Sequence, residues 1–397
     1  MKILVVHNRY QHWGGEDVVF DQECALLRQA GHEVVTYLRD NDDVDGYKGM
    51  ERLALIPRTI WARDSRREFA AIVYREKPDI VHVHNTFIMI SPSIFSVCEK
   101  AGIPVVQTLH NYRLMCPAGT FFRGGRVCEE CAEKSLWSGI RYGCYRGSKS
   151  ATAVVAGMIA VHRSLGTWTQ PHHFYIALTQ FSRQKFIDAG LPTDRIFVKP
   201  NFVDPDPGFE AEKDSYALYV GRLSPEKCVG ALLEGWERAK ARFPLLILGG
   251  GPEREALEKM VSDRKLTGVQ FRGQVARDEV ISTIRRARFL LFSSEYYENF
   301  PVTLAEAFAC GTPVICSRMG AMQEIVSDGR TGLHYAPGRI EDLAEKMDWA
   351  WAHPERMNEM GMESRREYET KYTAATNYKL LMDIYAQAMG RDEPSGT

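Results

Sequence analysis

The chain has 397 residues, which is enough for two domains of ordinary size and too many for one compact core. Hydrophobic residues make up 45% and charged residues 25% of the chain, a composition that excludes a largely disordered protein. The 50 basic residues balance 51 acidic ones to a net charge of −1, so nothing indicates a nucleic-acid partner.

The apolar runs are short. Residues 3–6 are too few for the core of a signal peptide, and the longest run, residues 151–161, falls below the roughly 18 residues that span a bilayer. We therefore expect a cytoplasmic protein. Disulfides do not persist in that compartment, so the nine cysteines should be buried thiols or metal ligands.

Apolar runs alternate with helical periodicity along the chain. A first series of buried strands is predicted at residues 3–6, 33–37, 79–83, 104–108 and 175–178, with helices at 17–30, 66–76 and 92–101. A second series follows at 217–220, 245–248, 269–272, 289–292 and 313–316, with helices near 229–240, 253–262, 278–286 and 302–309. This alternation predicts parallel sheets with ligand sites at the carboxyl ends of the strands.

A proline-rich stretch without periodicity, residues 199–214, separates the two series and reads as a linker. The predicted fold is therefore α/β, with two doubly wound Rossmann-like domains facing a cleft. We place them at residues 1–200, with a cysteine-rich insert at 111–147, and at residues 201–372. Residues 340–389 have helical patterning, and we expect the last segment, 373–397, to hold a helix that packs back on the first domain.

Glycine-rich turns follow strands in both predicted domains. Gly14 and Gly15 precede the first helix, where they could let a ligand approach the backbone and the helix terminus, although a plain loop is the simpler explanation. The spacing is not that of a dinucleotide fingerprint. In the second domain, residues 249–252 form a turn in which Gly250 could line a nucleotide or serve only the turn.

Charged residues follow two strands of the second domain. Arg222 and Lys227 lie on one loop, as a diphosphate site would require, although a solvated loop would also contain them. Glu298 precedes a helix whose first turn accommodates Pro301, and Glu306 lies about one turn inside that helix. The two carboxylates could accept hydrogen bonds from sugar and ribose hydroxyls. Alternatively, Glu306 is a semi-buried charge paired with another residue.

In combination, Gly14-Gly15, His110, Gly221-Arg222 with Lys227, and Glu298 separated by seven residues from Glu306 resemble the retaining GT-B glycosyltransferases of family GT4. The stretch 298–314, followed by Gly320, Glu324 and Gly332, is similar to the C-terminal signature of that family. The resemblance extends from the first strand to about residue 370.

The resemblance implies a role for each of these residues. Arg222 and Lys227 would bind the donor diphosphate, Glu306 the ribose, and Glu298 the transferred sugar beside the amides of Asn299 and Phe300. Gly14 and Gly15 would approach the donor from the first domain, where His110 would touch the sugar or phosphate. A lone histidine at a strand end is more often structural, so only the family supports His110.

The same resemblance implies a donor that is a nucleoside-diphosphate sugar, with UDP or GDP as the nucleotide, and a glycan or lipid-linked glycan as acceptor. Fixed cations would stabilise the leaving diphosphate, whose oxygen would take the acceptor's proton, so no side-chain nucleophile is expected. No catalytic metal is expected either. Asp43-Val44-Asp45 and Asp204-Pro205-Asp206 spell a metal-binding string but do not follow strands, and we interpret both as loop acids. Pro301 replaces a glycine of many relatives and would shift the sugar contacts.

Four cysteines lie within 29 residues of the insert: Cys116, Cys128, Cys131 and Cys144. A C-x₂-C pair flanked by two further cysteines is typical of a closed structural zinc site. The insert is polar and rich in glycine, so a metal would supply the stability that burial cannot. Free thiols, a redox pair or an iron–sulfur cluster are the alternatives.

Basic and aromatic residues interleave in the first domain. They are Arg58, Arg63, Arg66, Arg67, Arg75 and Lys77, with Trp61, Phe69 and Tyr74. A solvated helix face accounts for them, and peripheral contact with an anionic inner membrane face is the alternative.

We therefore predict a retaining glycosyltransferase of polysaccharide or glycoconjugate biosynthesis. A nucleotide-sugar epimerase or hydrolase of the same fold, and a non-catalytic nucleotide-sugar-binding protein, are the other hypotheses.

Overall fold

The protein consists of two compact α/β units. The computed structural model describes residues 1–11, 14–44 and 50–390. The first unit comprises Met1–Phe121, Cys128–Pro200 and the chain from Asn377, and the second comprises Phe122–Val127 and Asn201–Thr376. Each unit is built on a six-stranded parallel sheet, so the predicted pair of Rossmann-like α/β domains is confirmed.

The sheet of the first unit has the strand order β2-β1-β3-β4-β7-β8, and all neighbouring strands are parallel. The strands are β1 (Lys2–Arg9), β2 (Glu33–Asp40), β3 (Ile80–Val83), β4 (Val105–Thr108), β7 (His173–Ala177) and β8 (Ile196–Val198). Its larger helices are α1 (Gly15–Gln29), α2 (Met50–Ile60), α3 (Arg63–Glu76), α4 (Phe95–Ala101), α7 (Lys149–Ser164), α8 (Gln180–Asp188) and α16 (Ala374–Ala388). Strand β8 is short and was not predicted.

The last helix joins the first unit. On α16, the Tyr378 hydroxyl lies 2.8 Å from His32 Nε2, and the Asn377 amide donates to the carbonyl of Pro200 at 2.8 Å. Tyr385 on the same helix is fully buried. The C-terminal helix therefore completes the core of a domain that the chain began some 300 residues earlier.

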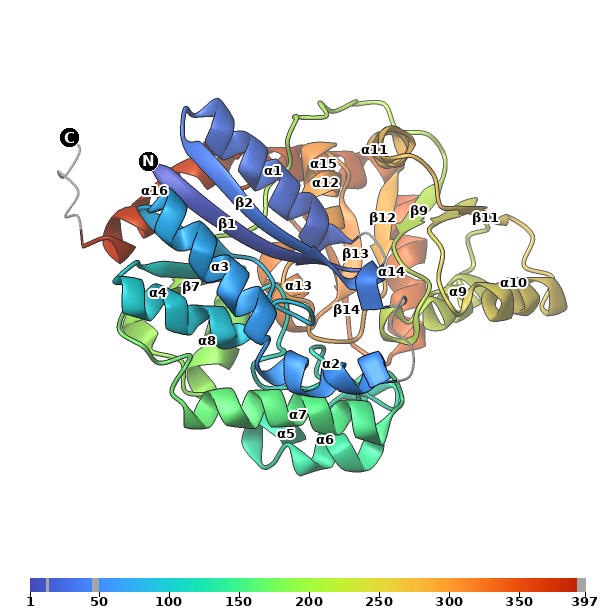
Figure 1. Ribbon diagram of the computed structural model, residues 1–397. Helices are drawn as coiled ribbons and strands as arrows, with labels where there is room; N and C mark the ends of the chain where they lie inside the picture. The colour runs from blue at the N-terminus through green and yellow to red at the C-terminus, as the bar shows by residue number, and fades with distance from the viewer. Residues whose placement is uncertain (12–13, 45–49, 391–397) are drawn as a thin grey trace. The chain divides into compact units, whose positions relative to one another are not determined.

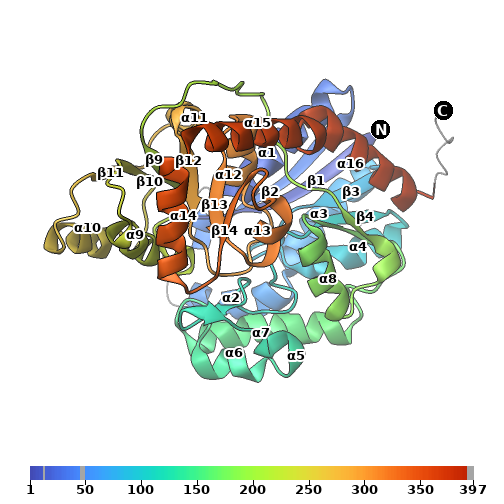
Figure 2. The same cartoon turned by 180° about the vertical axis from the view of Figure 1, so that it is seen from behind.

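The cysteine-bearing insert has little regular structure. A two-stranded antiparallel hairpin, β5 (Phe122–Arg123) and β6 (Arg126–Val127), groups with the second unit rather than with the predicted first domain. Helices α5 (Glu130–Glu133) and α6 (Trp137–Tyr142) follow, and α6 packs on α7, as Figure 2 shows.

The sheet of the second unit has the strand order β11-β10-β9-β12-β13-β14, again parallel throughout. The strands are β9 (Ala217–Val220), β10 (Leu245–Leu248), β11 (Val269–Gly273), β12 (Phe289–Phe292), β13 (Val314–Ser317) and β14 (Gly332–Tyr335). The helices are α9 (Val229–Arg238), α10 (Arg254–Asp263), α11 (Arg277–Arg286), α12 (Val302–Ala309), α13 (Gly320–Ile325), α14 (Ile340–Ala352) and α15 (Pro354–Lys371). In Figure 1, β11 lies at one edge of this sheet, near α9 and α10.

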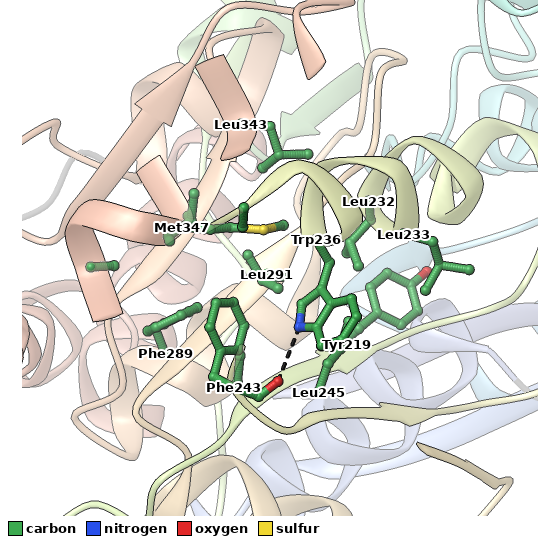
Figure 3. Close-up of a cluster of buried hydrophobic side chains, with 14 of the residues drawn as sticks. Tyr219, Leu232, Leu233, Trp236, Phe243, Leu245, Phe289, Leu291, Leu343 and Met347 are labelled. Atoms are coloured by element: carbon green, nitrogen blue, oxygen red, sulfur yellow. Dashed lines mark hydrogen bonds between the residues drawn. The ribbon is translucent and has the colours of Figure 1, made fainter. Parts of the chain in front are cut away.

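One aromatic cluster anchors the second unit. Figure 3 shows Trp236 of α9 among side chains from the sheet and from α14, with its indole N–H donating to the carbonyl of Phe243 at 3.0 Å. Leu343 and Met347 of α14 close the cluster from the other side. This packing fixes α9, and with it the loop that connects β9 to α9.

No described helix is long and apolar enough to cross a membrane. Of the interleaved aromatic residues, Phe69 is fully buried in the core of the first unit, whereas Tyr74 is 59% exposed. Arg58 pairs with Asp64, and Arg66 donates to the Ser96 hydroxyl. Part of the pattern therefore serves the fold.

Candidate active site

The loop after β9 carries the two predicted cations. Arg222 follows the strand directly, whereas Lys227 ends a turn of 3₁₀ helix, Pro225–Lys227, just before α9. Leu223 between them is fully buried and pins the loop to the core. The Arg222 side chain is 60% exposed and the Lys227 side chain 19% exposed, so the loop presents one accessible and one sheltered cation.

Lys227 and Glu298 meet at the carboxyl ends of β9 and β12. The ammonium lies 2.5 Å from Glu298 Oε1, which also accepts from the Ser294 hydroxyl at 2.8 Å. The Tyr296 hydroxyl donates to the other carboxylate oxygen at 2.7 Å. Lys227 Nζ lies 5.2 Å from the centroid of the Tyr296 ring, a cation–π contact. Lys227 and Glu298, which the sequence assigned to different parts of the donor, are thus in direct contact, and Ser294 and Tyr296, which the sequence did not single out, hold the carboxylate.

Arg222 belongs to the same cluster. Its guanidinium is 3.3 Å from Glu226 Oε1, and that carboxylate also accepts from Ser224 at 2.7 Å. Burial, together with Glu298, raises the pKa of the Tyr296 phenol well above its ordinary value, and the nearby Arg222 charge opposes that rise. The Arg222 charge therefore acts on Tyr296, which also contacts Lys227 and Glu298.

Glu306 is buried in the first turns of α12, as predicted, and it has a partner. Arg277, the first residue of α11, lies 3.0 Å from Glu306 Oε1. Burial raises the pKa of Glu306, and the Arg277 guanidinium opposes that rise. The buried carboxylate is therefore paired with a partly exposed arginine, as the alternative interpretation of Glu306 had it.

The glycine turn after β10 is required by the protein's own packing. A Cβ at Gly249 would come within 1.9 Å of the carbonyl oxygen of Gly221, and one at Gly251 within 2.3 Å of that of Leu223. Gly250, the predicted ligand residue, accepts a hydrogen bond from the amide of Leu223 at 2.8 Å. The turn therefore braces the loop that carries Arg222.

The residues between Glu298 and α12 are buried. Asn299 is 7% and Phe300 6% exposed, and the Phe300 ring packs edge-on against Tyr372. Helix α12 has the predicted bounds, and Pro301 is its N-cap in extended conformation rather than a residue of its first turn. Burial of Asn299 and Phe300 and the position of Pro301 hold the backbone beside Glu298 in place.

In the first unit, Gly14 is the N-cap of α1. Its φ of −134° is open to any residue, and its amide donates to Asp17 Oδ2 at 3.0 Å. That interaction satisfies one helix-terminal amide internally. Gly15, the first residue of α1, is exposed.

His110 follows β4 and contacts a second histidine. Its Nε2 lies 3.0 Å from Nδ1 of His84, and the two rings stack with centroids 5.2 Å apart. Burial and the nearby His84 hold the pKa of His110 well below its ordinary value, so the imidazole is neutral at physiological pH. His84 in turn stacks on His82 and lies 3.3 Å from Glu23, which is paired with Lys199. None of these three residues was predicted to belong to a site.

The four insert cysteines lie in the first unit and form no disulfide; Cys116 and Cys131 are buried, and Cys128 and Cys144 are partly exposed. Burial raises the pKa of Cys131 to about 11, and the proximity of the other three cysteines adds to this rise. Among the described residues, only Glu23, His82 and His84 form a group of three candidate ligands whose ligand atoms lie within 4.8 Å of one another. The four cysteines are therefore near one another, but no three of their sulfur atoms lie within 4.8 Å of one another.

The two acidic strings have different outcomes. Asp45 lies outside the described residues, so the string 43–45 is untested. In the other, Asp206 forms a two-pronged ion pair with Arg365, with distances of 2.7 and 2.6 Å. Asp206 therefore has a structural partner on α15.

Each of the two α/β units has a parallel sheet, and the second carries cations and carboxylates at the ends of its strands. This combination is that of a glycosyltransferase-like architecture. The family model described as Glycosyltransferase Family 4 matches residues 13–207, and that described as Glycosyl transferases group 1 matches residues 203–367. Together they span nearly the whole chain. The protein therefore belongs to the GT4-type glycosyltransferases, whose members have the GT-B fold.

Individual relatives are distant. O-antigen chain mannosyltransferase C of Escherichia coli is 28% identical over 44% of this chain and 47% of its own. Alpha-maltose-1-phosphate synthase of Mycolicibacterium smegmatis is 28% identical over 78% of this chain and 79% of its own. The chain spans between 42% and 60% of the length of the first curated relatives that it matches.

The solved structures confirm the fold. Anabaena HepE, determined in complex with UDP, superposes with a TM-score of 0.68 at 16% identity, covering 98% of this chain and all of the other. At this identity the similarity concerns the fold alone.

Proposed function

We propose that the protein is a retaining glycosyltransferase that moves a sugar from a nucleoside-diphosphate sugar to a glycan or lipid-linked glycan. The observation that carries this proposal is the cluster at the strand ends of the second unit, where Lys227 and Glu298 are in contact and Arg222 is exposed beside them. Family membership, and relatives that act on O-antigen chains, support a place in polysaccharide or glycoconjugate biosynthesis.

The cluster has the chemistry that the reaction needs. Breaking an anomeric bond builds negative charge on the departing diphosphate, and fixed cations stabilise that charge without reorganising. Arg222 can bind two phosphate oxygens with its planar fork, whereas Lys227 supplies a point charge. Glu298, held by Tyr296 and Ser294, would accept hydrogen bonds from hydroxyls of the transferred sugar, beside the amides of Asn299 and Phe300.

The remaining predicted residues complete the site in this proposal. Glu306, which lies 3.0 Å from the Arg277 guanidinium, would accept hydrogen bonds from the ribose hydroxyls. Gly14, Gly15 and His110 would contact the donor from the first unit, and Gly250 would line the nucleotide. UDP is the first nucleotide to test because Anabaena HepE was determined with UDP, and GDP is the second.

Thermal-shift measurements with UDP, GDP, ADP, TDP and NAD on the wild type and on Arg222→Ala test the donor site. A nucleoside diphosphate at about 100 times its Kd should add about 2.7 kcal/mol of stability, which is several degrees in Tm. The shift should be lost in Arg222→Ala and kept in Arg356→Ala, because Arg356 is a similarly exposed, ion-paired arginine on α15. A shift with NAD alone, or with no diphosphate, would refute the proposal.

The reaction type needs a second experiment. Incubating the enzyme with the nucleotide sugar identified above, with and without a lipid-linked glycan, and recording NMR spectra of the product gives its anomeric configuration. Retention of the donor's configuration, with turnover dependent on the acceptor, is expected. Equal donor consumption without acceptor would instead identify an epimerase or hydrolase, and binding without turnover a non-catalytic protein.

We also propose that Cys116, Cys128, Cys131 and Cys144 hold a structural zinc ion. Four thiolates at about 2.3 Å would close the coordination sphere, and the other three cysteines are already near enough to Cys131 to raise its pKa. Elemental analysis should find one zinc per chain in the wild type and in Cys98→Ala, which removes a buried cysteine of α4, and none in Cys131→Ser. Wild-type protein that contains no zinc, and whose Tm does not change when zinc is added, would show that the four thiols do not hold the metal.

Contact with a membrane is a further part of the proposal, since a lipid-linked acceptor lies at one. Flotation with anionic and neutral vesicles at low salt tests it. Binding only to the anionic vesicles is expected, and its absence would remove the membrane from the proposal.

A further inference from the structure

A chain of buried polar groups runs behind His110 in the first unit. Lys199 Nζ lies 2.8 Å from Glu23 Oε2, and both side chains are 1% exposed. The other oxygen, Glu23 Oε1, is 3.3 Å from Nε2 of His84, whose Nδ1 faces Nε2 of His110 at 3.0 Å. The series Lys199–Glu23–His84–His110 joins the end of β8, helix α1 and the ends of β3 and β4.

Glu23, His82 and His84 have the residue types of a metal site, but their charge is already balanced. Lys199 neutralises Glu23, and the Asn377 side-chain oxygen accepts a second hydrogen bond from the same ammonium at 3.2 Å. His82 is engaged by the hydroxyls of Tyr385 at 2.7 Å and Thr108 at 2.8 Å. A buried ammonium within hydrogen-bond distance of the carboxylate disfavours a metal cation there.

The protonation of this series follows from its geometry. Burial raises the pKa of Glu23, but Lys199 and the neighbouring histidines outweigh burial and hold it well below its ordinary value, so the carboxylate only accepts. The ring nitrogen of His84 that faces it must therefore carry the proton. The contact is not well aligned, yet a bare nitrogen lone pair toward a carboxylate would be repulsive.

The remaining nitrogens are then determined in turn. Burial, with His82, lowers the pKa of His84 to about 3, so His84 is neutral and has only one N–H. Its Nδ1 is an acceptor, and the 3.0 Å contact requires His110 to donate from Nε2. His110 is also neutral, so its Nδ1 has no proton.

We propose that Glu23, held by Lys199, is a positioning residue that fixes His84 and His110 in one tautomer each, so that His110 presents Nδ1 as a hydrogen-bond acceptor to a substrate hydroxyl. The role toward substrate rests on the proposed function, whereas the tautomer assignment does not. His110 is partly exposed and lines a cavity of about 40 Å³ with His84, Asn85 and Thr108.

Glu23→Gln makes a specific test because Lys199 would orient the new amide. Its oxygen would stay on the ammonium, so its NH₂ group would take the place of Oε1, 3.0 Å from His82 Nδ1 and 3.3 Å from His84 Nε2, and its two protons would let it donate to His84 as well as to His82. His84 would then protonate Nδ1 and donate to His110, whose proton would move to Nδ1. The substitution is isosteric, and it inverts both tautomers.

The experiment is NMR of the full chain labelled with ¹⁵N-histidine, with long-range proton–nitrogen correlations to read each tautomer. The signals of His110 are identified by their loss in His110→Ala. We expect an Nε2 proton on His110 in the wild type and an Nδ1 proton in Glu23→Gln. Tyr385→Phe, which removes a hydroxyl from His82 but leaves Glu23, His84 and His110 in place, should keep the wild-type pattern. An Nδ1 proton on His110 in the wild type, which needs no variant, would overturn the proposal, as would an unchanged pattern in Glu23→Gln.

Activity then separates the two proposals. Glu23→Gln should lower kcat/KM for the sugar donor by about 10–100-fold, the usual effect of losing an orienting partner, while the thermal shift with UDP or GDP stays unchanged. A wild type that binds neither nucleotide would refute the proposed function and leave the tautomer result standing. Inverted tautomers with unchanged kcat/KM would refute the role of His110 Nδ1 toward substrate.

Discussion

Both units place polar groups at the carboxyl ends of parallel strands, but in opposite ways. In the second unit the cations are accessible, with Arg222 60% and Lys227 19% exposed, and their partners come from two neighbouring loops. In the first unit Lys199, Glu23 and His84 are buried, and they come from three elements far apart in the sequence. Exposed charges can be exchanged for ligand contacts, whereas buried ones can only orient what lies in front of them.

This comparison predicts that buried charges determine stability and accessible charges determine turnover. The largest effect is therefore expected for Lys199→Met, which leaves Glu23 ionised and buried without its cation. Removal of one partner from a buried pair costs about 3–5 kcal/mol of unfolding free energy, measured here by urea unfolding. The double variant Lys199→Met with Glu23→Gln should recover most of that loss, because no uncompensated charge remains.

Lys185→Met is the matched control, since Lys185 pairs with Glu129 in the same unit while both side chains are 22% exposed. It should cost less than about 1 kcal/mol. Equal losses in Lys199→Met and Lys185→Met would mean that burial does not distinguish the two pairs.

Lys227→Ala is expected to affect catalysis instead. Loss of a fixed charge that stabilises the transition state typically lowers kcat by about 10²–10³-fold, and steady-state kinetics would measure it. Unfolding should change little, because Glu298 keeps its hydrogen bonds from Tyr296 and Ser294. Lys259→Ala, which breaks an exposed pair with Asp263, should leave kcat unchanged. A Lys227→Ala enzyme with wild-type kcat would remove this residue from the chemistry.

The same difference explains what the sequence could predict. Arg222, Lys227 and Glu298 lie in loops after strands and Glu306 lies in the helix that follows, so local patterns pointed to them, and the structure brings Lys227 and Glu298 into contact. Tyr296 and Arg277 were missed because a tyrosine in a loop or an arginine at a helix start carries no local signal of its partner.

The network of the first unit could not have been found in that way. Lys199 was assigned to a linker, yet it is buried against α1 and against Asn377 of α16. Pairings between residues more than 170 positions apart depend on the tertiary fold. One signal was present: His82 is on β3 and His84 directly follows that strand, two residues on, and their rings stack with centroids 4.5 Å apart. For the glycines of residues 249–251 the sequence left a nucleotide contact and a tight turn open, and the structure shows that internal packing alone already requires Gly249 and Gly251.

The pH dependence of stability should reflect the buried histidines. The pKa of His84 is about 3 in the folded protein and near 6.5 when unfolded, so only the unfolded state takes up its proton between these values. The contribution of His84 to the unfolding free energy is therefore fully present above about pH 6.5. Below that pH it falls by about 1.4 kcal/mol per pH unit. Depression of the pKa of Glu23 acts in the same direction at lower pH.

Urea unfolding between pH 5 and 7 would measure this slope. His84→Gln should remove the contribution of one proton, about 1.4 kcal/mol per pH unit, from this slope. His353→Gln, at an exposed position after α14, should leave the slope unchanged. An unaltered slope in His84→Gln would show that His84 is protonated in the folded protein.

The smallest effect is expected for the stability of Arg222→Ala. The contact with Glu226 joins residues four apart on one loop, is 3.3 Å long and has a largely exposed guanidinium, so its loss should change the unfolding free energy by no more than about 0.5 kcal/mol. Arg365→Ala in the same unit should cost more, because that side chain is 14% exposed and binds both oxygens of Asp206. Urea unfolding of the two variants makes the comparison. A loss in Arg222→Ala as large as that in Arg365→Ala would mean that Arg222 supports the loop, and its effect on nucleotide binding would then have a structural cause.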